Sequence, residues 1–155
     1  MQAGLSTLGI TFGYGVETTA GTKPDTFTKL NRINEVSEAT VDPEKIDASA
    51  LEDSKTKNIA GRDTVSDTLT VTVNLTDETE AEWEAVRTAY EALTGGKQMW
   101  FEIIVPGLTK AIFIKAAPPS VLPVPSMSQN SLLTIDINLT LEELVGFDTK
   151  VAFTP

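Results

Sequence analysis

The chain has 155 residues, 41% of them hydrophobic, and a formal net charge of −10. This length fits one domain, 1–155, with a core of its own. Histidine and cysteine are absent, which excludes disulfides, thiolate metal sites and histidine-based catalysis. The acidic charge argues against sequence-independent binding to nucleic acid, which depends on Lys and Arg at phosphates. No apolar run reaches the roughly 20 residues of a membrane helix, so we expect no membrane partner. The first residues lack a positively charged region and an uninterrupted apolar stretch, so we expect no signal peptide.

The first element is a strand, because apolar residues alternate with Thr and Gly at its start. The apolar positions are Leu8, Ile10, Phe12 and Tyr14. The glycines on its other face indicate either the close approach of another backbone or a weakly specified edge strand, and the sequence leaves both open. After a turn-rich linker, residues 30–36 have helical spacing, yet their setting favours a bulged strand.

Residues 36–62 form a long, polar, charge-dense segment with few apolar side chains. Structureless connections longer than roughly 12–15 residues are uncommon in compact domains and are usually functional or disordered. We therefore expect a loop that the protein uses on a partner rather than in its own core. Its acids leave a weak structural cation site as a minor alternative, without the spacing of an EF-hand loop. These acids are Asp42, Asp47, Glu52 and Asp53.

Clean alternation predicts an antiparallel strand over residues 68–75, followed by one helix over 77–93. An apolar stripe defines the buried face of that helix: Trp83, Val86, Tyr90 and Leu93. Asp77 or Thr79 is expected to cap it, with Thr79 and Glu82 spaced as a capping box. The helix carries six acidic residues and one arginine, so we expect the outer side of the helix to be solvated. A ligand platform built from Trp83 and Tyr90 is less favoured than core packing.

Strands are also predicted over residues 99–105, 110–116 and 133–141. The first two are apolar on both faces, so a second layer or a neighbouring subunit must cover them, and we weigh these equally. Residues 117–130 carry four prolines and should be extended outside any ladder. The tail, 142–155, has no clear pattern. The fold class is mainly β: a β-sandwich or barrel with one flanking α-helix and a long assembly loop.

No residue pattern of an enzyme is present. There is no P-loop and no dinucleotide fingerprint. Carboxylate pairs could serve glycoside hydrolysis, but the acids lie on the helix face or in polar loops, where solvated charge is the favoured interpretation. We expect no enzymatic activity, no cofactor and no metal.

Short motifs in the polar segment carry a family resemblance, together with the order of the elements around them. They are Pro43-Glu44, Ile46-Asp47, Ser49-Ala50-Leu51, Ile59 and Gly61-Arg62-Asp63. The chain resembles the major tail tube proteins of tailed bacteriophages, especially those of long non-contractile tails, over roughly residues 5–141. Ala48-Ser49-Ala50 departs from the family, which often has a threonine soon after the aspartate.

The resemblance implies a structural virion protein, made in the bacterial host cytoplasm and located in the tail. Six copies would join their sheets into a ring with a continuous inner barrel, and rings would stack into a tube that conducts DNA without specific binding. Other implied partners are the terminator, tape measure and tail tip proteins. The residues expected to reach an adjacent subunit are Val41, Pro43, Ile46, Asp47, Leu51, Ile59 and Gly61. The alternatives are the tube protein of a contractile injection system and a monomeric carbohydrate- or surface-binding β-sandwich module.

Overall fold

The computed structural model describes residues 4, 8–52, 54–65 and 67–154, so Asp53 of the sequence predictions lies outside the described residues. These described residues contain one helix, α1 (Asp77–Glu91). The strands are β1 (Thr11–Val16), β2 (Phe27–Leu30), β3 (Ile33–Val36), β4 (Val41–Asp47), β5 (Asn58–Val65), β6 (Thr68–Asn74), β7 (Met99–Ile104), β8 (Lys110–Ala117), β9 (Thr134–Thr149) and β10 (Phe153–Thr154). The protein is mainly β with one helix, as the sequence predicts.

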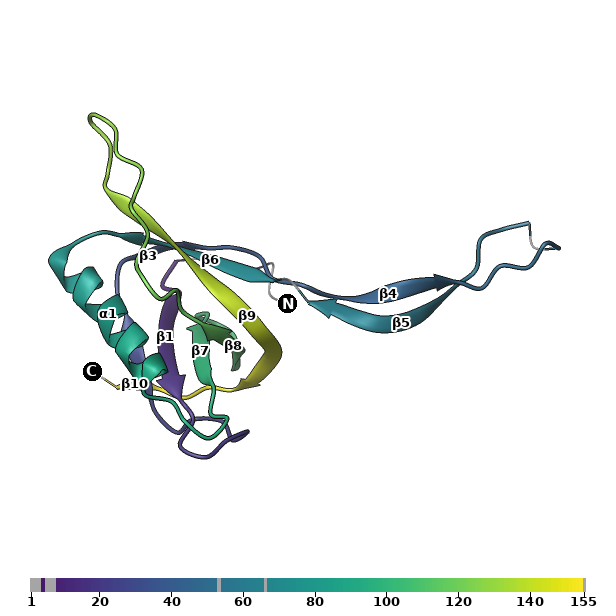
Figure 1. Cartoon of the computed structure of the whole chain (residues 1–155), viewed down its shortest axis with the longest axis horizontal. Helices are drawn as coiled ribbons and strands as arrows, with labels where there is room; N and C mark the ends of the chain where they lie inside the picture. The colour runs from purple at the N-terminus through teal and green to yellow at the C-terminus, as the bar shows by residue number, and fades with distance from the viewer. Residues whose placement is uncertain (1–3, 5–7, 53, 66, 155) are drawn as a thin grey trace.

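Eight of the strands form one curled sheet with the order β10-β2-β1-β7-β8-β9-β6-β3, and β4 and β5 pair separately (Figure 1). The sheet is antiparallel except where β10 runs parallel to β2. β9 pairs along its first half with β6 and along its second half with β8, where two register shifts bend it. The sheet thus wraps around a core and leaves β10 and β3 as its two ends.

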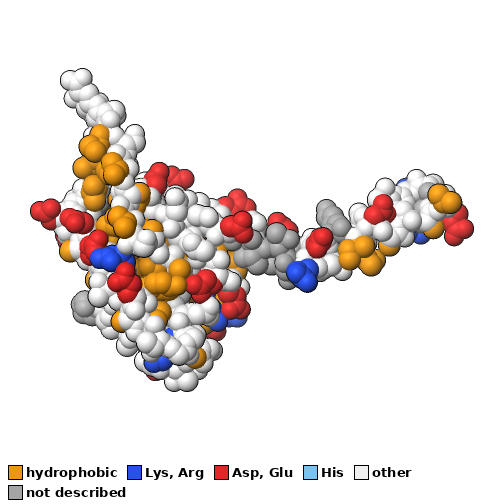
Figure 2. Space-filling view, in the orientation of Figure 1, with side chains coloured by type: hydrophobic (Ala, Val, Ile, Leu, Met, Phe, Trp, Pro, Cys, Tyr) orange, Lys and Arg blue, Asp and Glu red, His pale blue; other side chains and the backbone are white. Residues whose placement is uncertain are grey.

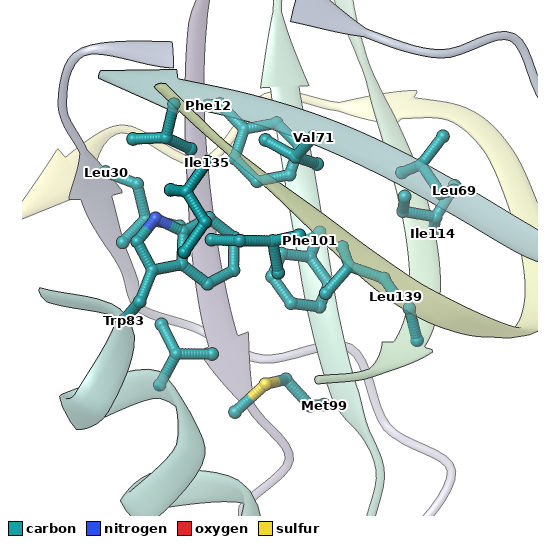
Figure 3. Close-up of a cluster of buried hydrophobic side chains, with 14 residues drawn as sticks. Phe12, Leu30, Leu69, Val71, Trp83, Met99, Phe101, Ile114, Ile135 and Leu139 are labelled. Atoms are coloured by element: carbon teal, nitrogen blue, oxygen red, sulfur yellow. The ribbon is translucent and has the colours of Figure 1, made fainter. Parts of the chain in front are cut away.

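The main core lies between the curled sheet and α1 (Figure 3). Trp83 and Val86 of the helix point into it, and the Phe12 and Phe101 rings from neighbouring strands stack at 5.6 Å. The predicted stripe of α1 is therefore core, as expected for apolar positions on one helical face. The aromatics that a carbohydrate-binding module would display are mostly buried here.

The opposite face of the sheet has a second, smaller core. Trp100 and Phe113 alternate along β7 and β8 with the main-core residues Phe101 and Ile114, so successive side chains enter opposite faces. Phe27 and the returning segment 150–154 cover this second cluster. In the free subunit, the chain itself therefore covers both faces of these strands where they are buried.

The N-terminus of α1 differs from the prediction. Thr76 is the N-cap, and its hydroxyl accepts a hydrogen bond from the Thr79 amide at 3.2 Å. Thr79 completes a capping box by accepting from the Thr76 amide at 2.8 Å. The expected box of Thr79 with Glu82 is wrong, because Glu82 instead accepts two bonds from Asn31 in the β2–β3 turn, at 2.9 and 2.6 Å. A threonine at N3 replaces the usual glutamate.

Three further segments refine or correct the prediction. Residues 30–36 contain the end of β2, a turn at Arg32 with φ 58°, and the bulged β3. The tail after residue 141 was expected to lack a pattern, but β9 continues to Thr149, with its bulges masking the alternation. β1 lies inside the sheet rather than at an edge, and the close approach predicted at its glycines is confirmed: a Cβ on Gly13 would lie 2.6 Å from the Thr28 carbonyl oxygen.

Candidate assembly surfaces

A two-stranded arm, formed by β4 and β5, extends away from the body of the protein (Figure 1). Val41 and Val65 pair at its base, and Asp47 and Asn58 pair near its tip. The sequence led us to expect an irregular loop at 36–62. The structure instead forms an antiparallel ribbon, because cross-strand backbone bonds do not require an apolar face.

Polar contacts close the outer end of the arm. The Ser49 hydroxyl accepts from the Lys57 amide at 2.7 Å, and the Ala48 amide donates to the Lys57 carbonyl at 2.8 Å. The Asp47 carboxylate accepts from the Ser49 amide at 2.9 Å. Hydrogen bonds from the Ser49 amide and hydroxyl hold the pKa of Asp47 below its ordinary value. Asp47 is therefore a local turn-forming residue of the arm.

The arm presents apolar side chains to solvent. Ile46 and Ile59 pair across the two strands, are 47% and 56% exposed, and make an apolar patch on the arm. Gly61 lies beside Ile46, since a Cβ added there would be 3.1 Å from the Ile46 Cδ1. Leu51 is fully exposed in the tip. A two-stranded ribbon with this exposure is at best marginally stable alone, and burial against another surface would stabilise it.

The structure thus brings together only part of the predicted assembly set. Ile46, Ile59 and Gly61 share one patch in the outer half of the arm. Leu51 is separated from them at the tip. Pro43 lies opposite Asp63 beside the register shift, the kind of position at which a strand tolerates proline, and Val41 marks the base.

A second projection, residues 118–133, was predicted to be extended but was not recognised as a surface. It rises from the body between β8 and β9 and carries a group of exposed apolar side chains (Figures 1 and 2). Val124 is 85% exposed, and the others are Val121, Met127, Leu132 and Leu133. The signal was present in the sequence, because no charged residue occurs between Lys115 and Asp136.

Across the described ranges, no three of His, Cys, Asp or Glu are grouped so as to hold a metal ion. On α1, Arg87 binds Glu84 and Glu91 at 2.6 and 3.0 Å, while the first-turn acids are exposed near the positive end of the helix dipole. No helix in the described part of the chain is long and apolar enough to cross a membrane.

These features define a class: a structural subunit whose conspicuous surfaces are projections suited to contacts with other protein surfaces. Comparison with known families identifies the class further. Residues 3–149 match the phage tail tube protein (TTP) family, so the chain belongs to this family. Its members are structural rather than enzymatic components of the tail, and the tail tube assembles from such subunits.

Two solved structures share the fold. A chain of the anti-feeding prophage (AFP) baseplate, 6-fold symmetrised, aligns with a TM-score of 0.59 at 12% identity, over 93% of this chain and 95% of that one. A chain from the tail of an empty GTA particle with C6 symmetry aligns with a TM-score of 0.55 at 11% identity, over 91% and 95%. No curated protein matches the sequence.

Proposed function

We propose that six copies of this chain form a ring, that rings stack into a tail tube, and that the β4–β5 arm docks on a neighbouring subunit. DNA passes through the lumen of this tube during ejection without specific binding. The terminator, tape measure and tail tip proteins are its further partners. The two fold relatives come from assemblies described with 6-fold and C6 symmetry, which supports the choice of six.

The observation that carries the proposal is the arm with its uncovered apolar patch. Ile46 and Ile59 contribute little to the body, so their burial needs another surface. Burying one such side chain stabilises by about 1.5–3 kcal/mol. Because each subunit repeats the same contact, a modest gain per arm is multiplied along a tube. A heterologous contact that closes by rotation gives rings, and open stacking gives a filament.

The register of the arm permits a clean test. Val41 and Val65 are cross-strand partners, so residues 42–64 can be replaced by an Asn-Gly turn that joins these two positions directly. The shortened protein should unfold in urea like the wild type but form no tubes in negative-stain micrographs. The matched control is Ile46→Val with Ile59→Val, which keeps the patch apolar and should still assemble. A shortened protein that forms normal tubes would remove the arm from the proposal.

The tail type is a separate part of the proposal. We infer a long non-contractile tail from the family resemblance, with the tube of a contractile injection system as the alternative. The AFP relative shares the fold at an identity too low to decide between them. Purification of native tail particles would decide between the two tail types. A sheath protein around the tube would assign the contractile type.

A further inference from the structure

The segment 150–154 returns across the face of the sheet turned away from α1 and ends in β10. β10 is two residues long and pairs in parallel with β2, with Phe153 opposite Phe27 and Thr154 opposite Thr28. It is therefore the terminal strand at this end of the sheet. Because the family match ends at residue 149, this strap (residues 150–154) lies beyond the matched part of the chain.

The strap is held by a few polar and backbone contacts and by the packing of Val151 and Phe153 against the second core. The Phe153 ring sits directly over Gly13, where a Cβ would lie 2.3 Å from it. The Thr154 hydroxyl donates to the Phe27 carbonyl at 3.1 Å, and the Val151 amide donates to the Glu102 carboxylate at 2.9 Å. The two residues of β10 cover half of the four-residue β2, so the ladder at this edge is short. Very short edge strands are one way in which proteins protect a sheet edge from pairing with another chain.

Glu102 shows that the strap only partly satisfies the site beneath it. Its side chain is 0% exposed, and its second oxygen, Oε1, has no hydrogen-bond partner among the described residues. Buried carboxylate oxygens are normally hydrogen-bonded, because an unpaired one loses its hydration without compensation. Lys23 lies nearby, but its ammonium donates to the Thr149 carbonyl at 2.6 Å and sits 4.1 Å from the Phe113 ring centre. Release of the strap would open Glu102 to water or to donors of a partner.

The other end of the sheet is β3, which has β6 as its neighbour within the described sheet. The two ends of one sheet are therefore different, as a head-to-tail contact between copies requires. Backbone bonds from an added strand give affinity to such an edge. A second copy is the partner because the tube is built from repeats of one chain.

We propose that the outer edge of β2 is a docking edge for a strand of a second copy, and that residues 151–154 occupy this edge in the free subunit and leave it on assembly. The inference rests on the proposed function, since it names the edge that ring formation uses and the intramolecular segment that blocks it. The exchange conserves backbone pairing along β2 and extends it to Lys29 and Leu30, which β10 does not reach.

The cysteine-free sequence allows a reversible test. Thr28 and Thr154 lie opposite each other on adjacent strands, and the spacing of adjacent strands falls within the Cα–Cα range of a disulfide. The double variant Thr28→Cys with Thr154→Cys can therefore form a disulfide that locks the strap to β2. The oxidised variant should stay as free subunits in light scattering, at concentrations at least tenfold above those at which it assembles after reduction. The control pair, Thr70→Cys with Asn138→Cys, joins β6 and β9 inside the sheet, where these side chains already meet at 2.8 Å. It should assemble in both redox states.

A second variant lacks residues 151–155 and should assemble at a lower concentration than the wild type, with circular dichroism confirming its fold. Two results would overturn the inference: a locked variant that assembles equally well before and after reduction, or a folded truncated variant that no longer assembles. If the truncated protein fails to fold, the locked pair alone decides. Failure of the wild type and of both states of the control pair to assemble would instead overturn the proposed function.

Discussion

The single residue that starts the helix is Thr76. Its hydroxyl satisfies the Thr79 amide, one of the amides that a helix N-terminus leaves without a partner. We expect Thr76→Ala to lower the free energy of unfolding by about 1 kcal/mol in urea titrations, the usual value of a lost N-cap. Thr88→Ala is the matched control, because Thr88 is exposed on the same helix, and it should change stability by less than about 0.5 kcal/mol. Equal losses in both variants would contradict the capping role.

The buried carboxyl of Glu102 makes stability depend on pH. Burial raises its pKa, and the Val151 amide, Lys23 and Lys150 oppose this rise without cancelling it. Between the ordinary value and the raised one, the folded protein binds more protons than the unfolded chain, so the free energy of unfolding falls as pH rises. We expect wild type to lose stability relative to Glu102→Gln as pH increases through this window, and to regain it below the ordinary value. Urea titrations of the wild type and Glu102→Gln at a series of pH values measure this difference.

At the scale of elements, the tip of the arm offers adjacent residues with different expected roles. Leu51 and Glu52 are both exposed, so Leu51→Ser and Glu52→Ser should leave the unfolding of the free subunit unchanged within about 0.5 kcal/mol. If the tip docks, Leu51→Ser loses apolar burial of about 1.5–3 kcal/mol, and each 1.4 kcal/mol is tenfold in affinity. We therefore expect it to raise the concentration needed for assembly at least tenfold by light scattering, and Glu52→Ser to have a much smaller effect. If both variants changed the concentration needed for assembly by a similar factor, the tip would make no apolar contact with a neighbouring subunit.

The elements that the sequence predicts well are those with a strict period. β6 and α1 alternate or repeat without interruption, and both are found within a few residues of the expected bounds. The second half of β9 was missed because register shifts place successive residues out of alternation. The arm was missed as a ribbon because its pairing rests on backbone bonds, while apolar pattern is the signal that sequence analysis detects. The strap was beyond reach for a related reason: two residues of parallel pairing leave no pattern.

For the candidate site, the sequence identified the right segment but not its geometry. Ile46 and Ile59 are thirteen positions apart in the chain and meet only because the hairpin register places them opposite each other. The uncharged projection of 118–133 was visible as composition, yet prolines alone predict only an extended chain. Its exposed position follows from the pairing of β8 with β9 in the sheet. This pairing is a tertiary contact that the local sequence pattern does not reveal.

At the scale of the whole molecule, charge opposes assembly. Each copy carries −10, from 22 acidic and 12 basic residues, so a ring of six carries a formal charge of −60, six times that of one chain. The proposed contacts are apolar side chains and backbone edges, which salt does not weaken by screening. Repulsion between copies is screened over about 8 Å at physiological ionic strength and about 3 Å at 1 M. Added salt should therefore weaken the repulsion between copies and leave the apolar and backbone contacts unchanged.

We expect the concentration for half-maximal assembly to fall as NaCl rises from about 0.05 to 0.5 M, measured by light scattering at fixed pH. The exposed first turn of α1 tests where the repulsion arises: Glu78→Gln with Glu80→Gln should flatten this salt dependence if the helix faces a neighbour. Glu38→Gln with Glu142→Gln, an equal charge change at exposed positions outside both α1 and the β4–β5 arm, is the matched control. Assembly that weakens with salt would mean that ion pairs between copies outweigh their net repulsion. The contacts would then have to include cationic residues of the body, rather than the apolar arm and the β2 edge alone.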